Sequence, residues 1–318
     1  MESLIEMKIL ISGGGGYIGS HVANELNSLG YEYCVFDNNL NKMQTKLPYG
    51  SDQILGDIKN YTDLESVFKK HQFSHVIHLA ALKSVKDSEE FPAAYYETNV
   101  VGTRNLILAM ETFGVTNLIF SSTAAVYGET TTGVVYETSE LNPISHYGKT
   151  KVDCELMIAE AEERFGLRFI NLRYFNVAGC LNHRLKDESR ENLIPAVVNQ
   201  VRNGKRPKIF GHDYHTHDGT AVRDFVHVSD IVRAHLTSLD YLSRGGTSDT
   251  FNIGTGLGTS VLEIVAEIIS QLDSNLKPEF LGRRKGDIGI VVADSSKVAK
   301  SMGFKTQFNL SQMIASIL

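Results

Sequence analysis

The sequence predicts an α/β protein: a doubly wound parallel sheet, followed by a smaller mixed α/β domain in the C-terminal part. Short apolar runs alternate with segments of helical periodicity as far as about residue 176, which is the pattern of parallel strands joined by crossover helices. Beyond that point, longer polar loops at 178–191 and 211–220 interrupt the alternation. Because 318 residues exceed the usual length of one domain, we place the first domain at 1–176 plus about 225–255, and the second at 177–224 and 256–318.

The first element is a buried strand from Lys8 to Ile11 that runs into a glycine-rich turn and then an amphipathic helix. We expect Ile18, Val22, Leu26 and Leu29 to face inward from that helix. The spacing Gly-x-x-Gly-x-x-Gly is typical of a Rossmann-type turn, which brings the backbone close to a pyrophosphate and points helix N–H groups at it. The predicted dinucleotide contacts in this turn are Gly13, Gly16, Tyr17, Ile18 and Gly19.

The second strand, Tyr33 to Phe36, ends in Asp37. An acid at this place accepts hydrogen bonds from an adenosine ribose and repels a 2′-phosphate, so we expect the cofactor to be NAD rather than NADP. The third strand, Gln53 to Leu55, leads to Asp57. That acid suits either a hydrogen bond to the adenine amine or the capping of a turn or helix, and both interpretations stay open.

The fourth strand, Val76 to Leu79, leads into Ala80 and Ala81, whose small side chains let a cofactor lie close to the backbone. A helix that includes Asn99 to Met110 and a fifth strand, Leu118 to Phe120, continue the alternation. Ligands of such sheets bind at the carboxyl ends of the strands. The hydroxyl groups from Ser121 to Thr123 are therefore expected near a nicotinamide.

Tyr147 and Lys151 are four residues apart, which places both side chains on one face if the segment is a helix. A tyrosine titrates near pH ~10, so a phenolate that works at neutral pH needs roughly 3 units of depression. A cation within about 4–6 Å in a partly dry site supplies about that much. The pair therefore indicates a general base and the cation that activates it.

The second half of the chain supplies further elements. A strand from Phe225 to Val228, a helix from Asp230 to Leu242 capped by Ser229, and a strand from Thr250 to Ile253 are expected to return to the first domain. Ser260 and Glu263 form a capping box at the start of another helix. Its apolar stripe, which we interpret as core, is Val261, Ile264, Val265, Ile268, Ile269 and Leu272.

Composition narrows the possible partners and compartment. The net charge is −6 with no basic block, which argues against nucleic acid or a membrane surface as the main partner. Cys34, Cys154 and Cys180 are odd in number and widely spaced, as expected of reduced thiols in a cytoplasmic protein. The N-terminal residues indicate neither a signal peptide nor a membrane span.

The motifs together resemble the extended short-chain dehydrogenase/reductase superfamily, and within it the family of UDP-glucose 4-epimerases. The wider motifs are similar along nearly the whole chain: Gly16 to His21, Asp37 to Asn41, Lys83 to Val85, Arg173 to Asn176, Asp218 to Thr220 and Val222 to His227. The resemblance implies an NAD-binding first domain, a second domain for a UDP-sugar substrate, and a homodimer. It also implies reversible epimerisation at carbon 4 through a 4-keto sugar.

The resemblance assigns roles residue by residue. Thr123 would be the catalytic hydroxyl, Tyr147 the base, and Lys151 the residue that activates the base and holds the nicotinamide ribose. The other expected cofactor contacts are Asp37, Asn38, Asn41, Asp57, Ile58, Ala80, Ala81, Lys83, Asn99, Ser121 and Phe175. The other expected substrate contacts are Asn176, Asn192, Leu193, Phe210, Arg223, Arg284, Asp287 and Val291.

Three features bear on the reaction and its alternatives. Related dehydratases and decarboxylases carry an acid just after the catalytic hydroxyl, where this chain has Ala124 and Ala125, so loss of water has no proton donor there. Val291 is intermediate in size at the position that admits or excludes an N-acetyl group, so UDP-glucose/UDP-galactose is preferred and the N-acetylhexosamine pair stays open. A UDP-glucuronate 4-epimerase and a non-enzymatic NAD sensor are the alternative functions.

The histidines His212, His215 and His217 lie beside two aspartates, so the donor types for a metal site are present. The segment matches a loop that binds no metal in the similar family. We therefore expect no metal in this protein, and histidines that are solvated or near the substrate.

Overall fold

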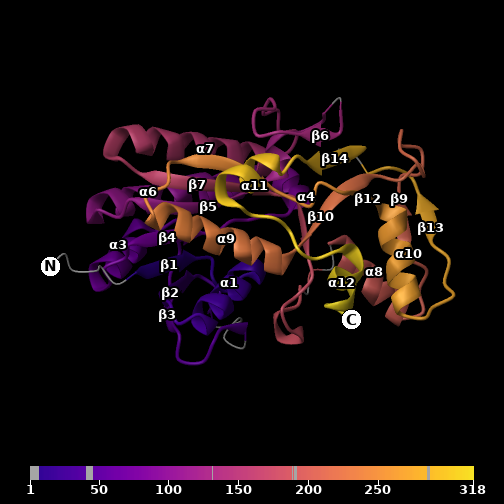
Figure 1. The fold of residues 1–318 in the computed structure, drawn as a ribbon, viewed down its shortest axis with the longest axis horizontal. Helices are drawn as coiled ribbons and strands as arrows, with labels where there is room; N and C mark the ends of the chain where they lie inside the picture. The colour runs from indigo at the N-terminus through magenta and orange to yellow at the C-terminus, as the bar shows by residue number, and fades with distance from the viewer. Residues whose placement is uncertain (1–6, 41–45, 131, 188, 190–191, 285–286) are drawn as a thin grey trace. The chain divides into compact units, whose positions relative to one another are not determined.

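The computed structural model describes residues 7–40, 46–130, 132–187, 189, 192–284 and 287–318 (Figure 1). The chain forms two compact units. The first consists of Met1–Val126, Pro143–Arg173 and Val232–Phe251, and the second of Tyr127–Asn142, Tyr174–Ile231 and Asn252–Leu318. None of the helices within the described ranges is long and apolar enough to cross a lipid bilayer.

The first unit is built on a seven-stranded sheet with the order β11-β7-β5-β4-β1-β2-β3. Its strands are β1 (Lys8–Ser12), β2 (Glu32–Asp37), β3 (Asp52–Leu55), β4 (His75–His78), β5 (Asn117–Thr123), β7 (Arg168–Tyr174) and β11 (Asp249–Ile253). β1 pairs in parallel with both β2 and β4, and the chain winds outward from it in both directions. The predicted doubly wound sheet is confirmed, and its switch point lies at β1 and β4.

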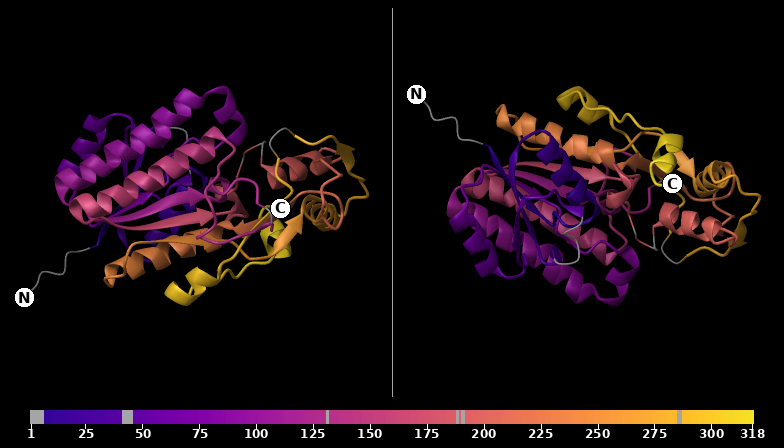
Figure 2. Two further views of the ribbon diagram at one scale, coloured as in Figure 1. Left: turned by 90° about the horizontal axis from the view of Figure 1, so that it is seen from above. Right: turned by 90° about the horizontal axis from the view of Figure 1, so that it is seen from below.

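Helices cover both faces of this sheet. They are α1 (Tyr17–Ser28), α3 (Tyr61–Lys70), α4 (Val85–Glu90), α5 (Pro92–Tyr95), α6 (Gly102–Phe113), α7 (His146–Phe165) and α9 (Val228–Ser243). Figure 2 shows α6 and α7 on one face of the sheet and α9 on the other. The core on the α6 side includes Leu64, Leu106 and Ile158, which are fully buried.

One expectation for these helices was wrong, and another differs in the type of helix. Leu29, predicted to face inward, is 56% exposed because α1 ends at Ser28 and Leu29 caps its C-terminus. The predicted helix that includes Asn99 to Met110 is helical throughout, but its first part is a π-helical turn at Tyr96–Val101 that leads directly into α6. A π-turn gives no periodicity signal because it adds one residue to a single turn.

The second unit has a five-stranded sheet and a two-stranded one. The strands are β6 (Val134–Val135), β8 (Asn176–Ala178), β9 (Lys208–Phe210), β10 (Val222–His227), β12 (Gly258–Ser260), β13 (Glu279–Leu281) and β14 (Ile290–Ala293). β10 pairs with β8, β12 and β14 in the second unit, so the predicted return of this strand to the first domain was wrong. Residues 127–142, which the sequence analysis placed in the first domain, belong to this unit because β6 pairs with β14.

Helices of the second unit form its core. They are η4 (His183–Leu185), α8 (Leu193–Arg202), α10 (Val261–Gln271), α11 (Ser296–Met302) and α12 (Leu310–Ala315). The predicted capping box of Ser260 and Glu263 is confirmed at the start of α10, and Ile264, Val265 and Ile268 from its stripe are fully buried. The predicted cap at Ser229 was wrong, because α9 already begins at Val228.

Candidate active site

The glycine turn between β1 and α1 is shaped by two close backbone approaches. Gly13 has a φ of +77°, and a Cβ there would lie 2.4 Å from the Ala80 nitrogen. A Cβ on Gly19 would lie 2.3 Å from the Gly13 carbonyl oxygen. A Cβ on Gly16 would meet only that oxygen, at 3.4 Å. The fold itself therefore requires Gly13 and Gly19, whereas Gly16 leaves room for a group that approaches from outside, as a pyrophosphate would.

Asp37, at the end of β2, is tied to this turn. Its carboxylate accepts hydrogen bonds from the N–H of Gly15 at 3.0 Å and from the N–H of Asn39 at 2.8 Å. Both bonds hold the carboxylate beside the turn, where an adenosine ribose would need an acceptor. Asn41, another expected contact, lies outside the described residues.

The expected cofactor contacts Asn38, Asp57 and Ile58 lie close together after β2 and β3. Asp57 accepts a hydrogen bond from the Lys59 N–H at 2.9 Å, and Asn38 lies 3.4 Å from its second carboxylate oxygen. The turn-capping interpretation of Asp57 therefore has a direct contact, while Asn60 caps α3. The Ile58 side chain is buried in the core, where a Cβ on Gly102 would lie 2.5 Å from it.

The segment after β4 holds several expected cofactor contacts. Ala80 and Ala81 are half-buried, and the ammonium group of Lys83 lies 5.9 Å from the centre of the Tyr17 ring. The Asn99 amide exchanges two hydrogen bonds with the backbone of Leu82, at 2.8 and 3.0 Å, and donates a third to Thr150. Asn99 thus fixes this segment to α7, a positioning role that its motif did not indicate.

Three hydroxyl groups at the end of β5 point to different partners. Ser121 Oγ lies 3.0 Å from His235 Nε2, and Ser122 Oγ donates to the Glu155 carboxylate. Among the residues that the structure describes, Thr123 Oγ1 makes one hydrogen bond, which it accepts from the Ala125 N–H at 3.2 Å. Its hydroxyl proton therefore remains available to a ligand.

The predicted helix that carries Tyr147 and Lys151 is confirmed as α7. Ser145 caps its N-terminus by accepting a hydrogen bond from the Gly148 N–H. A Cβ on Gly148 would lie 2.6 Å from the Ala125 carbonyl oxygen, so the glycine lets the first turn of α7 pack against the residues that follow β5. This contact brings the Tyr147 turn next to the strand end that bears Thr123.

Lys151 is buried and held in place by β5. Its Nζ donates a 2.8 Å hydrogen bond to the Ser121 carbonyl oxygen and lies 4.6 Å from the centre of the Phe120 ring. Burial lowers the pKa of Lys151 to about 8, and the nearby Cys154 and Glu155 oppose that shift. The group therefore keeps its positive charge at pH 7 in most molecules, as an activating cation must.

A buried histidine that sequence reasoning missed connects β1 and β4. Ser12 Oγ lies 2.6 Å from His78 Nδ1, and His78 Nε2 lies 2.9 Å from Thr103 Oγ1. Thr103 donates its own proton to the Asn99 carbonyl oxygen, so His78 must donate from Nε2 and accept from Ser12. Burial lowers the pKa of His78 to about 3, which keeps the ring neutral.

A buried ion pair was also missed, although Arg173 belonged to a recognised motif. Its guanidinium donates to both carboxylate oxygens of Glu155, with Nε at 3.0 and 3.2 Å. The two side chains are 5% and 7% exposed. Glu155 lies one turn after Lys151 on α7, so the pair fixes α7 to β7. A single sequence does not distinguish a glutamate that is buried in a helix from one that is exposed on it.

The second unit brings several of the expected substrate residues together. Arg223 and Val291 are paired on β10 and β14, and Arg223 Nη1 donates to the Gly289 carbonyl oxygen at 3.2 Å. Burial lowers the pKa of Arg223, while Asp287 and then Tyr214 raise it. The Arg284 guanidinium lies 3.9 Å from the centre of the Phe210 ring. Two guanidinium groups, one of them largely buried, are suited to bind phosphate oxygens.

Tyr214 lies in the same charged group and was not predicted. Its side chain is 6% exposed, and its hydroxyl has no hydrogen-bond partner among the residues that the structure describes. Burial raises its pKa, followed by Asp287, with Arg283 and Arg223 opposing. A buried hydroxyl without a partner is uncommon and indicates a place for a ligand.

The remaining expected residues are spread over the second unit. Phe175 is buried and donates its N–H to the Ile253 carbonyl oxygen, and Asn176 is exposed on β8. Asn192 caps α8, which begins at Leu193, and donates its amide to Asp187. In the histidine loop, His217 lies 3.4 Å from Glu263 and 3.7 Å from Asp218.

Comparison with known proteins agrees with this architecture. The model of the NAD dependent epimerase/dehydratase family matches residues 9–254. The chain belongs to this family. This chain is 37% identical over 312 residues to a UDP-glucose 4-epimerase of Rhizobium leguminosarum bv. trifolii. The alignment covers 97% of this chain and 95% of the relative.

Two solved structures resemble this family member over nearly its whole length. A UDP-glucose-4-epimerase from Stenotrophomonas maltophila, with bound NAD and formylated UDP-arabinopyranose, has a TM-score of 0.91 and 34% identity, covering 98% and 96% of the two chains. A UDP-Glc/GlcNAc 4-epimerase from Campylobacter jejuni has a TM-score of 0.84 and 37% identity, covering 98% of each chain. The epimerase/dehydratase fold is thus shown in full.

Proposed function

We propose that this protein catalyses the reversible, NAD-dependent inversion of carbon 4 in a UDP-hexose. The observation that carries the proposal is the first turn of α7, where Gly148 packs against Ala125 and places Tyr147 beside the end of β5. Lys151 is fixed under the same turn by its bond to the Ser121 carbonyl oxygen. The similarity to UDP-glucose 4-epimerases supports the choice of reaction.

The residues present fit NAD. Gly16 leaves the space that a pyrophosphate would fill, and Asp37 is held next to the turn as an acceptor for the adenosine ribose. Lys151 would contact the nicotinamide ribose, and Tyr17, Ile18, Ala80, Ala81 and Lys83 would line the remaining path. When bound, NAD supplies the acceptor of a hydride from carbon 4 and the donor that returns it to the opposite face.

The protein's own part is to move a proton. Tyr147, as phenolate, takes the proton from the 4-hydroxyl while Thr123 donates a hydrogen bond that orients the same oxygen. The Lys151 cation favours the phenolate over the phenol. When the 4-keto sugar is reduced on its other face, Tyr147 returns the proton to the oxygen. Ala124 and Ala125 provide no acid that would eliminate water from the keto sugar.

Inversion also requires that the sugar turns while the nucleotide stays bound. We assign Arg223 and Arg284 to the diphosphate, since charge-assisted hydrogen bonds hold phosphate strongly. The buried Tyr214 hydroxyl supplies a further donor beside Arg223. Asn176, Asn192, Leu193, Phe210 and Asp287 remain the proposed contacts for the nucleotide and sugar. Of these five side chains, one, Asp287, is charged. The neutral sugar ring therefore has few strong contacts and is free to rotate.

The activity is tested by mixing purified protein, without added NAD, with UDP-galactose or with UDP-N-acetylgalactosamine and separating the products by chromatography. We expect conversion of UDP-galactose to UDP-glucose. The similarity to an enzyme named for both UDP-Glc and UDP-GlcNAc supports some activity on the N-acetyl pair. No conversion of either sugar, even with NAD supplied, would refute the proposal and favour a uronic acid substrate or an NAD-sensing role.

Val291 is the proposed determinant of sugar choice. It is 8% exposed and lies beside Arg223 on the neighbouring strand. Val291→Tyr should lower the ratio of kcat/KM for the N-acetyl sugar to that for UDP-galactose by at least about 10-fold, because the added ring occupies the space of the acetyl group. Val291→Ala serves as the matched control that adds no bulk. An unchanged ratio in Val291→Tyr would place the determinant elsewhere.

We also propose a homodimer formed through α6 and α7. Leu108 on α6 and Leu156 on α7 are 46% and 58% exposed, so each offers an apolar side chain to such an interface. Light scattering after size exclusion should give twice the monomer mass of 35.2 kDa. The variant Leu108→Glu/Leu156→Glu should elute as a monomer, while Leu257→Glu, on a loop of the second unit, should remain dimeric. A monomeric wild type would contradict the proposal.

The two units receive separate roles in this proposal. The first would bind NAD and carry Thr123, Tyr147 and Lys151, while the second would hold the UDP-sugar through its arginines. We place the protein in the cytoplasm, and its three free, buried cysteines support a reducing compartment.

A further inference from the structure

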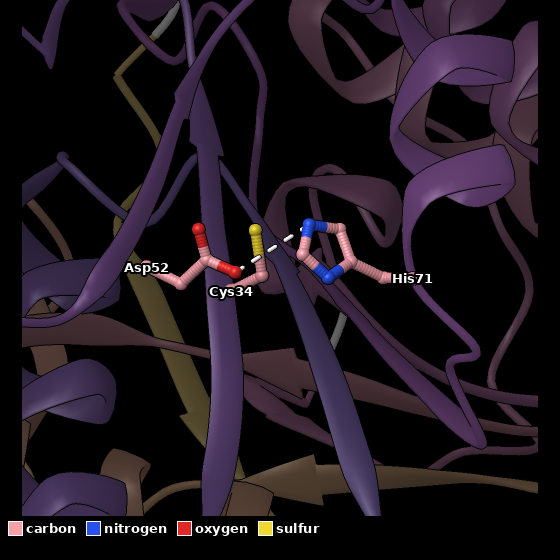
Figure 3. Close-up of side chains that lie close together, drawn as sticks. All are labelled: Cys34, Asp52 and His71. Carbon is pink, nitrogen blue, oxygen red and sulfur yellow. Dashed lines mark ion pairs between the residues drawn. The ribbon is translucent and has the colours of Figure 1, made fainter.

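Three potential metal ligands lie together in the first unit, beside β2 and β3 at one edge of the sheet (Figure 3). Cys34 lies on β2 and Asp52 is the first residue of β3. The two are directly paired in the parallel register, so their side chains project from the same face of the sheet. His71 follows α3 and caps its C-terminus. Rigid elements therefore supply all three groups.

The ligand atoms already lie close together. One atom from each residue falls within 4.8 Å of the others, and His71 Nε2 is 3.4 Å from a carboxylate oxygen of Asp52. Two nitrogen or oxygen ligands bound to one tetrahedral zinc at about 2.1 Å are about 3.4 Å apart. One edge of the tetrahedron thus has the required length, and the thiol, within 4.8 Å of the other two ligand atoms, must move closer to complete a triangular face.

His71 provides an independent indication. Its side chain is 8% exposed, yet Nε2 has no hydrogen-bond partner among the described residues. The same nitrogen faces the cluster in Figure 3. This nitrogen lies 3.4 Å from the Asp52 carboxylate, which is too long for a strong hydrogen bond. A buried imidazole nitrogen without a hydrogen-bond partner is available as a ligand.

From these contacts we propose that Cys34, Asp52 and His71 form a zinc-binding site. One sulfur, one nitrogen and one carboxylate oxygen are the donor set of zinc rather than of magnesium or calcium, which prefer oxygen alone. The Asp52 side chain is 36% exposed, so the ion has an entry path and water completes the tetrahedron. This site departs from the expectation of no metal, which was based on the histidine loop alone.

The charges around the site bear on its affinity. Lys8 and Lys70 lie near enough to influence both Cys34 and His71, and they oppose a cation. A thiolate and the Asp52 carboxylate together balance the charge of Zn²⁺. Without a metal, burial raises the pKa of the Cys34 thiol to about 12, so the thiol must lose its proton to bind the ion. We therefore expect a moderate-affinity site, not one that holds zinc irreversibly.

Zinc at this place would link the C-terminus of α3 to two neighbouring strands. The same strands lead to Asp37 and Asp57 at their carboxyl ends, where the adenosine half of NAD is proposed to bind. Because the site is away from Thr123, Tyr147 and Lys151, its consequence is stability of the adenosine half and not chemistry. Saturating zinc should raise the Tm of the wild type, since a ligand of the native state stabilises it.

The test uses the full chain without a polyhistidine tag, treated with chelator and then freed of it, in a non-chelating reductant. Calorimetric titration should give one Zn²⁺ per chain. Co²⁺ should produce a cobalt–thiolate charge-transfer band that Zn²⁺ abolishes. Cys34→Ser and His71→Gln should each weaken Zn²⁺ binding by at least about 100-fold, since even indirect partners of a metal site are worth 10–100-fold.

Matched controls are Cys180→Ser, a buried cysteine of the second unit, and His183→Gln, an exposed histidine. Both should bind Zn²⁺ and Co²⁺ as the wild type does. Absence of stoichiometric binding, or Co²⁺ binding without the thiolate band, would overturn the proposal. Unchanged affinity in the Cys34 and His71 variants would do the same. If Cys34→Ser does not fold, a wild-type cobalt spectrum without the thiolate band still overturns the proposal.

Discussion

Tyr147→Phe is expected to lower kcat for UDP-galactose by about 100- to 10 000-fold, the range typical of a lost general acid–base group. The change removes one oxygen and retains the ring, which is half-buried in the first turn of α7. Both halves of the reaction need this oxygen, since it first accepts and later returns the same proton. The loss should therefore be equal in the two directions of the equilibrium.

Binding should distinguish a catalytic role from a structural one. The Kd for UDP, measured by calorimetry, should stay within a few-fold of the wild-type value because the phosphate contacts are assigned to Arg223 and Arg284. Tyr49→Phe is a matched control: it also removes a phenolic hydroxyl, but from a fully exposed ring, and its kcat should be unchanged. A Tyr147→Phe variant with the full wild-type rate would refute the assignment of the base.

The sequence predicted those features in which local pattern and function coincide. The glycines, the acid at the end of β2 and the four-residue spacing of Tyr147 and Lys151 each report on one short segment, and each segment adopts the expected element. The capping box of α10 is equally local. Such local patterns predict structure correctly because residues close together in the sequence are enough to determine the element that forms.

The features that were missed depend on partners far apart in the chain. β6 has two residues, and only its pairing with β14, more than 150 positions later, places 127–142 in the second unit. The sequence of β10 predicts a strand that could join either sheet. Its pairing with β8, β12 and β14 places it in the sheet of the second unit. A run of apolar residues predicts a strand but does not identify its neighbour.

Buried polar groups are the second class of missed features. His78 and Glu155 look like ordinary polar residues in the sequence, yet they are 1% and 7% exposed. Each is stabilised by partners from other elements: Ser12 and Thr103 for the histidine, Ser122 and Arg173 for the glutamate. Because burial without partners would be prohibitive, the partners must be known before such burial can be predicted.

The second large effect concerns the stability of α7. Arg173→Met should lower the free energy of unfolding by about 3–5 kcal/mol, because it leaves the Glu155 carboxylate buried without its counter-ion. Ser122 still donates to that carboxylate, but a single hydroxyl cannot replace a two-pronged guanidinium. Urea unfolding, followed by circular dichroism, should show the loss as a lower midpoint.

The surrounding structure predicts how the loss can be reversed. In the double variant Arg173→Met/Glu155→Leu both charges are gone, and most of the stability should return because a buried ion pair is worth little more than apolar residues of similar size. Arg244→Met, in the exposed Arg244–Asp240 pair, is the matched control and should cost less than about 1 kcal/mol. A double variant no more stable than Arg173→Met would show that the Arg173 guanidinium stabilises α7 through contacts other than Glu155.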